Sequence, residues 1–69
     1  MFVIDIKIIE EKNNIKIYNC GVLIIEESNY NEIVLTIKEA LTIIEDDLYQ
    51  IEVLRKVLRQ VEDIKRLVA

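Results

Sequence analysis

The C-terminal part of the chain, residues 31–69, contains neither glycine nor proline. These two residues break helices most strongly, because glycine costs backbone entropy and proline removes a hydrogen-bond donor. Apolar residues recur in this stretch at steps of three and four, which places them on one side of a helix. At its start, Asn29 followed three residues later by Glu32 fits a capping box. The pattern therefore predicts one long helix over residues 29–69.

The apolar spacing changes within this helix, because the step from Ile51 to Leu54 is three residues where four is expected. Such a skip rotates the apolar side of a helix. Beyond Ile51 the apolar arc is also wider than one neighbouring helix covers. We therefore predict that the first half packs on the chain's own sheet and that the second half contacts another helix, from a second copy or from a different protein. The predicted interface residues are Tyr49, Leu54, Val57, Leu58, Val61, Ile64, Leu67 and Val68.

The acidic residues 45–47 allow an alternative, in which the helix breaks there and folds back on itself. Helix ends usually carry glycine or proline. Residues 45–47 include neither, so we favour the continuous helix.

The N-terminal residues 2–10 are rich in β-branched side chains. The even positions Phe2, Ile4, Ile6 and Ile8 are all apolar, and this period of two is typical of a half-buried strand. Two consecutive asparagines follow, and asparagine favours hairpin turns. The alternating stretch after them predicts a second, antiparallel strand.

Cys20 and Gly21 interrupt this returning strand. If they form a bulge, residues 22–25 continue the strand and the hairpin has two long arms. If they form a turn, residues 22–26 are the third strand of a meander. We favour the bulge, because the first strand is long enough to pair along the whole return. The unbroken apolar run 22–25 predicts that both faces of the sheet are covered there.

The predicted fold class is α+β: a single ββα domain over residues 1–69, with an antiparallel β-hairpin in 1–27 and one long helix in 29–69. Chains of this size bury only about 60% of their unfolded surface and usually need a disulfide, a metal or self-association. This chain has one cysteine, no histidine and 52% hydrophobic residues. We therefore expect a dimer or higher oligomer, with the dimer favoured. The helices are the favoured contact, and pairing of the strand edges at residues 2–9 is the alternative.

No residue is predicted to be catalytic or to bind a cofactor or a metal. Cys20 has no histidine to activate it as a nucleophile. The acidic clusters at 26–27 and 45–47 lack the alternating ligands and the central glycine of a calcium loop. A domain this small also has little room for a substrate pocket. We therefore expect neither enzymatic activity nor a small-molecule substrate.

The net charge of −4 argues against non-specific nucleic-acid binding, which depends on an excess of Lys and Arg. No apolar run reaches the roughly 18 residues of a transmembrane helix. The first residues lack the basic region and the cleavage site of a signal peptide. We therefore expect no membrane partner and a cytoplasmic location.

The favoured function is a non-enzymatic accessory or adaptor subunit that docks on a larger protein assembly through its long helix. One alternative is an acidic inhibitor that mimics nucleic acid to block a nuclease or host factor, and steep salt dependence would distinguish it from hydrophobic docking. A second alternative is a dimeric nucleic-acid-binding ribbon-helix protein. In it, phosphates would be contacted by Lys12, Lys16 and the basic residues near the C-terminus. The predicted fold does not choose among these, because a hairpin followed by a helix occurs in many unrelated proteins.

Overall fold

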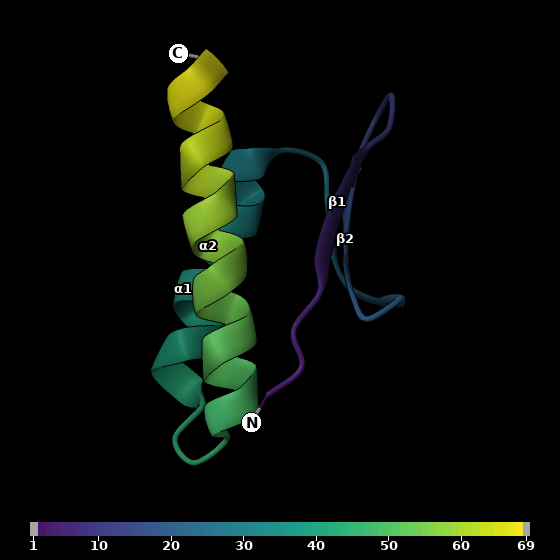
Figure 1. Ribbon diagram of the computed structural model, residues 1–69. Helices are drawn as coiled ribbons and strands as arrows, with labels where there is room; N and C mark the ends of the chain where they lie inside the picture. Colours follow the sequence, from purple (N-terminus) through teal and green to yellow (C-terminus); the bar gives the residue numbers. More distant parts are fainter. Residues whose placement is uncertain (1, 69) are drawn as a thin grey trace.

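The chain forms three strands and then two helices in a computed structural model that describes residues 2–68. The strands form one antiparallel sheet in the order β1-β2-β3, and both helices lie against the same face of it (Figure 1). The α+β class is therefore confirmed. In chain order the elements are β1 (Ile6–Glu10), β2 (Ile15–Asn19), β3 (Val22–Glu27), α1 (Tyr30–Ile43) and α2 (Leu48–Val68).

β1 and β2 form the hairpin that the alternating sequence predicts, with Ile8 opposite Ile17 at its centre. The first strand is shorter than predicted, because it begins at Ile6 and residues 2–5 before it are not part of a strand. The N–H of Glu11 donates to the carbonyl oxygen of Asn14 at 2.8 Å and closes the turn. The side chains of Ile8 and Ile17 face the helices, so one face of this hairpin is apolar and packed.

The connection at Cys20 and Gly21 is a turn between β2 and β3. Both residues have positive φ angles, 52° and 81°, as a two-residue turn of type I′ requires. The favoured bulged hairpin is therefore wrong, and the three-stranded meander is right, because two successive positive φ angles reverse the chain. A bulge does occur further on: Leu23 pairs with Tyr18 and Ile25 with Ile17, which leaves Ile24 as the extra residue.

The prediction of one continuous helix over 29–69 is also wrong, because α1 ends at Ile43 and α2 begins at Leu48. Ile44 has an extended backbone with φ −74° and ψ 122°, which stops α1. The Asp47 carboxylate accepts a hydrogen bond from the N–H of Gln50 at 3.1 Å and so caps α2. A helix break therefore forms without glycine or proline, and α2 folds back against α1.

The hydrophobic core lies between the sheet and the two helices. Ile17 of β2, Ile33 and Ile37 of α1, and Val57 and Val61 of α2 are fully buried in it. Full burial of each such side chain contributes roughly 1.5–3 kcal/mol. The central part of the apolar arc of α2 is therefore covered by the chain's own sheet and by α1, whereas Leu48 and Leu67 near its two ends stay exposed.

A polar cluster fixes the first residues of the chain and the first turn of α2 to the sheet. The buried Asn19 side chain accepts a hydrogen bond from the N–H of Asp5 at 3.0 Å and donates one to the Tyr49 hydroxyl at 2.7 Å. That hydroxyl donates in turn to the carbonyl oxygen of Val3 at 2.9 Å. The ring of Tyr49 meets Phe2 edge to face, with the centroids 5.5 Å apart.

Candidate interaction surface

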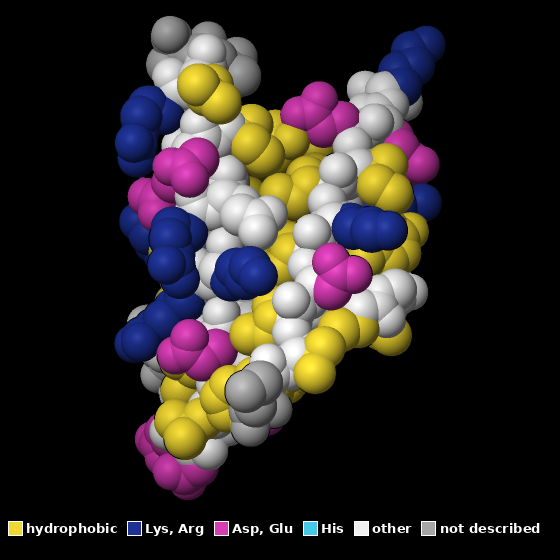
Figure 2. All heavy atoms as spheres, in the orientation of Figure 1, with side chains coloured by type: hydrophobic (Ala, Val, Ile, Leu, Met, Phe, Trp, Pro, Cys, Tyr) yellow, Lys and Arg dark blue, Asp and Glu magenta, His cyan; other side chains and the backbone are white. Residues whose placement is uncertain are grey.

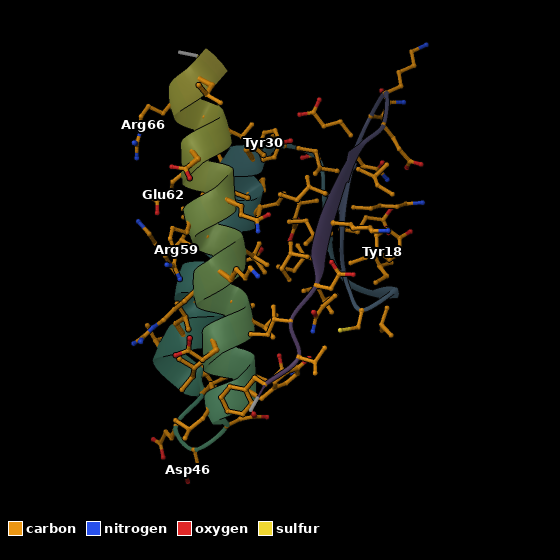
Figure 3. The ribbon with its side chains drawn as sticks, viewed as in Figure 1. Tyr18, Tyr30, Asp46, Arg59, Glu62 and Arg66 are labelled. Atoms are coloured by element: carbon orange, nitrogen blue, oxygen red, sulfur yellow. The ribbon has the colours of Figure 1, made fainter. Side chains whose placement is uncertain are left out.

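The sheet has one packed face and one open face. Side chains on the inner face, Ile8 and Ile17 among them, contact the core beneath the helices. Alternate residues point the other way, and Tyr18 is seen to point away from both helices (Figure 3). No helix or strand among residues 2–68 covers this second face. We call it the outer face and define it by Lys7, Ile9, Lys16, Tyr18, Leu23, Ile24 and Glu26.

The centre of the outer face is apolar. Ile9 on β1 is 45% exposed, Leu23 on β3 is 42% exposed, and Ile24 beside it is 37% exposed. Antiparallel sheets that face water on one side normally alternate apolar and polar residues so that the exposed side is polar. Three large aliphatic side chains and a tyrosine instead form a small apolar patch on this face.

One end of the outer face is closed by polar contacts within the chain. The Lys16 ammonium lies 3.4 Å from the Glu11 carboxylate, and the Asn14 amide donates to the Glu26 carboxylate at 2.5 Å. The hydrogen bond to Glu11 and the charges of Glu11 and Glu26 raise the pKa of Lys16. Lys7 at the other end has no ion-pair partner among residues 2–67, so its charge is available to a neighbour.

The predicted interface residues on α2 lie mostly inside the chain's own fold. Leu54, Val57 and Val61 are buried in the core, and Leu58 packs against it. The argument that a second chain must cover them does not hold, because it assumed a continuous helix. Of the remaining predicted residues, Ile64 and Tyr49 are half-buried, Leu67 is 86% exposed, and the side chain of Val68 lies outside the described part of the chain. Contact of any of them with a partner stays a prediction.

The side of α2 that faces away from the sheet is charged, with both signs interleaved (Figure 2). Arg59, Glu62 and Arg66 all point outward there (Figure 3). Arg66 forms an ion pair with Asp63 at 3.5 Å. Alternating signs of this kind are typical of a solvated helix surface and give no continuous basic strip for a phosphate backbone.

The single cysteine and the acidic side chains are the groups to consider for chemistry in the described part of the chain. Cys20 is a free, exposed thiol in the turn, and its Sγ lies 3.7 Å from the carbonyl oxygen of Val3. Residues 2–67 contain no cluster of three or more cysteine, aspartate or glutamate side chains placed to hold a metal ion. Neither α1 nor α2, as far as each is described, is long and apolar enough to span a membrane.

No protein-family model, curated protein or solved structure matches the chain. The surface geometry therefore carries the functional argument. Sequence reasoning missed the outer face because it read the apolar run 22–25 as a strand covered on both sides. One signal in the sequence could have indicated this apolar face. Ile9 is apolar, although Lys7, the other residue of β1 on the same side, is charged.

Proposed function

We propose that the protein is a non-enzymatic accessory or adaptor subunit that docks on a larger protein through the outer face of its sheet. The carrying observation is that the helices pack on one face only, while Ile9, Leu23 and Ile24 remain exposed on the other. Exposed apolar groups grouped on one face lower their free energy when a partner removes them from water. The docking surface is thus the sheet, and the helices act as the scaffold behind it.

The charges at the rim indicate the kind of partner. Lys7 is exposed and has no carboxylate partner among residues 2–67, whereas Lys16 is already paired with Glu11. A complementary surface would therefore have an apolar centre for Ile9 and Leu23 and a carboxylate at the edge that meets Lys7. This describes a protein surface, because a nucleic acid would bring a phosphate backbone against Glu26.

The size of the outer face sets the strength of such docking. Three strands about 4.8 Å apart, two of five residues and one of six, cover roughly 250 Å² at about 3.3 Å per residue. A standard interface buries roughly 800 Å² on each partner. The partner must therefore also reach around the rim of the sheet, which a groove in a larger protein can do. Contact with the flat face alone would be weak and short-lived.

Two other functions receive less support from the geometry. An acidic nucleic-acid mimic needs free carboxylates in one continuous surface. In the sheet and its turn, Glu11 pairs with Lys16, Glu26 accepts from Asn14, and Glu27 accepts from the Thr36 hydroxyl at 2.6 Å, which leaves the acidic residues 45–47 between the helices as a separate group. A nucleic-acid-binding ribbon needs a basic surface, and the basic residues of α2 alternate with acidic ones.

The test compares two matched variants that each place a carboxylate on an exposed leucine. Leu23→Glu changes the outer face, and Leu35→Glu changes the solvent side of α1, where Leu35 is 53% exposed. Each immobilised protein captures partners from an extract of the native host, and any partner is then purified for affinity measurement. We expect a protein that binds the wild type and Leu35→Glu with equal affinity and binds Leu23→Glu at least roughly tenfold more weakly.

The opposite pattern, loss with Leu35→Glu and retention with Leu23→Glu, would place the docking surface on the helices and refute the proposal. Equal capture by all three proteins would refute it as well. Salt separates the acidic-mimic alternative, because charge-driven binding weakens steeply as ionic strength rises and apolar docking does not.

A further inference from the structure

β1 is an edge strand with no neighbouring strand on its outer side among residues 2–68. Two hydrogen bonds give the direction of its backbone: Cys20 N–H donates to the carbonyl of Asp5 at 2.9 Å, and Glu11 N–H donates to Asn14 at 2.8 Å. The odd-numbered residues therefore turn their backbone groups toward β2. In an antiparallel ladder the even-numbered residues turn theirs away. Ile6 and its even-numbered neighbours thus present free N–H and C=O groups at the edge.

The two edges of the sheet differ in regularity. β3, the other edge strand, carries the bulge at Ile24, and a bulge interrupts the row of backbone groups that a new strand would pair with. β1 pairs with β2 residue for residue over its whole length. A regular edge is a ready template for another strand. The edge of β1 is therefore the better suited of the two for strand addition.

The sequence of this edge is complementary to itself in charge. Residues 4–8, which are the two residues before β1 and its first three, read Ile, Asp, Ile, Lys, Ile. The pairing described next requires Ile4 and Asp5 to continue the line of the strand. If two copies run antiparallel with Ile6 opposite Ile6, then Asp5 of each copy lies opposite Lys7 of the other. Ile4 of each copy lies opposite Ile8 of the other, on the face that packs against the helices. Both charged pairs fall at positions without inter-strand hydrogen bonds, where opposite side chains approach most closely.

Other two-fold registers of β1 are worse. A two-fold axis perpendicular to the sheet places residues of the same face opposite each other. The axis therefore lies midway between the two copies of one residue, and each register is named by that residue. An axis at Lys7 sets two ammonium groups against each other. An axis at Ile8 places Ile6 of one copy opposite the carboxylate of Glu10 of the other. An axis at Ile9 places Ile8 opposite Glu10 instead. The axis at Ile9 does pair Lys7 with Glu11, but only the axis at Ile6 combines opposite charges on the outer face with apolar pairs on the inner face over residues 4–8. Its one mismatch, Phe2 opposite Glu10, involves a residue that lies outside β1.

We propose that β1 pairs with β1 of a second copy of the chain about a two-fold axis at Ile6. The two sheets would then form one continuous sheet of six strands, with about six new inter-strand hydrogen bonds. Both helical hairpins would lie on the same side. α2 flanks β1, and apolar side chains lie between them on the side seen in Figure 2. A second copy on this edge would cover that apolar strip. Both this proposal and docking through the outer face use Lys7, but they involve different surfaces, the β1 edge and the outer face, which Leu23→Glu distinguishes.

Charge exchange at two exposed positions tests this register. The side chains of Asp5 and Lys7 form no hydrogen bond or ion pair within residues 2–67, so Asp5→Lys and Lys7→Asp should fold as the wild type does, which circular dichroism checks. We expect the wild type to form a dimer of the 8.1 kDa chain in sedimentation equilibrium. Each single variant places like charges opposite each other twice and should self-associate roughly tenfold more weakly.

The decisive measurement mixes the two variants. Asp5→Lys and Lys7→Asp should form a heterodimer with each other, because every opposite pair then joins a lysine to an aspartate. The double variant Asp5→Lys/Lys7→Asp should regain the wild-type dimerisation constant. A wild type that stays monomeric to millimolar concentration, single variants that dimerise as tightly as the wild type, or a mixture without heterodimer would each overturn the proposal.

Leu23→Glu separates this dimer from docking on the outer face. It should leave the dimerisation constant unchanged, because Leu23 lies on β3 and not on the β1 edge. If Leu23→Glu dissociates the dimer while the charge variants do not, the copies meet face to face and the edge register is wrong. Loss of partner capture with an intact dimer, or the reverse, shows which of the two proposals fails.

Discussion

Asn19 connects three parts of the chain through one side-chain amide. It is 7% exposed, it accepts from the Asp5 N–H, and it donates to the Tyr49 hydroxyl at the start of α2. We predict that Asn19→Ala destabilises the protein by about 2–3 kcal/mol, although it removes no apolar contact of the core.

The magnitude follows from the groups left behind. Two hydrogen bonds contribute about 1 kcal/mol each, and a buried donor without a partner costs part of a further 1–3 kcal/mol. At roughly 0.05–0.15 kcal/mol per residue, a domain of this size has about 3–10 kcal/mol of stability. The expected loss is therefore a large fraction of the total and lowers Tm by roughly 10–20 °C.

Urea and thermal unfolding, followed by circular dichroism, measure the effect. Asn13→Ala in the exposed hairpin turn is the matched control and should change the free energy of unfolding by less than about 0.5 kcal/mol. Tyr49→Phe removes the other end of the Asn19 contact, and the double variant should show a coupling energy of about 1 kcal/mol. A loss below about 0.5 kcal/mol for Asn19→Ala, or no coupling, would refute this account.

Three further outcomes are expected. Burial and a hydrogen bond to Glu10 raise the pKa of Tyr30 to about 12, whereas the pKa of tyrosine in the unfolded chain is about 10. The stabilisation of the folded state that results from this difference is therefore complete below pH 10 and is lost as the pH rises toward 12. Because the ring is partly solvated, we expect this stabilisation to be about 1 kcal/mol. It is measured as the difference in the free energy of unfolding between the wild type and Tyr30→Phe, followed as the pH is raised. Cys20→Asn should raise Tm slightly, since asparagine before glycine suits a type I′ turn, and an unchanged or lower Tm contradicts that assignment. Asp47→Ala removes the cap on Gln50 and should cost about 1 kcal/mol in urea unfolding; no loss would mean that the cap does not stabilise α2.

The parts of the fold that the sequence predicts are those with a local signal. Alternation of apolar residues predicts β1 and β2, and paired asparagines predict the turn between them. Asn29 accepts a hydrogen bond from the N–H of Glu32 at 2.9 Å, as the capping motif predicts. In each case residues close in sequence satisfy one another, so no knowledge of distant contacts is needed.

The two errors arise where an unusual residue replaces the expected one. Cys20 holds a positive φ angle of 52°, a conformation that asparagine or glycine normally adopts. Asp47 caps α2 at the end of a short connection, residues 44–47, that contains no glycine or proline. Burial of Val57 and Val61 against α1 and the sheet stabilises that reversal, and such tertiary packing overrides the local helix preference.

The position of the free apolar surface follows from this one reversal. In a continuous helix, Val57 and Val61 would face solvent, and association through the helix would be required to cover them. Once α2 folds back, these residues are buried. Exposed apolar side chains remain on the helices, such as Leu35 and Leu67, and on the outer face of the sheet, where Ile9, Leu23 and Ile24 lie. The high apolar content of a small chain thus predicts that it associates. The reversal between α1 and α2 removes the reason to place that association on Val57 and Val61, and the proposals above place it instead on the open face and the regular β1 edge of the sheet.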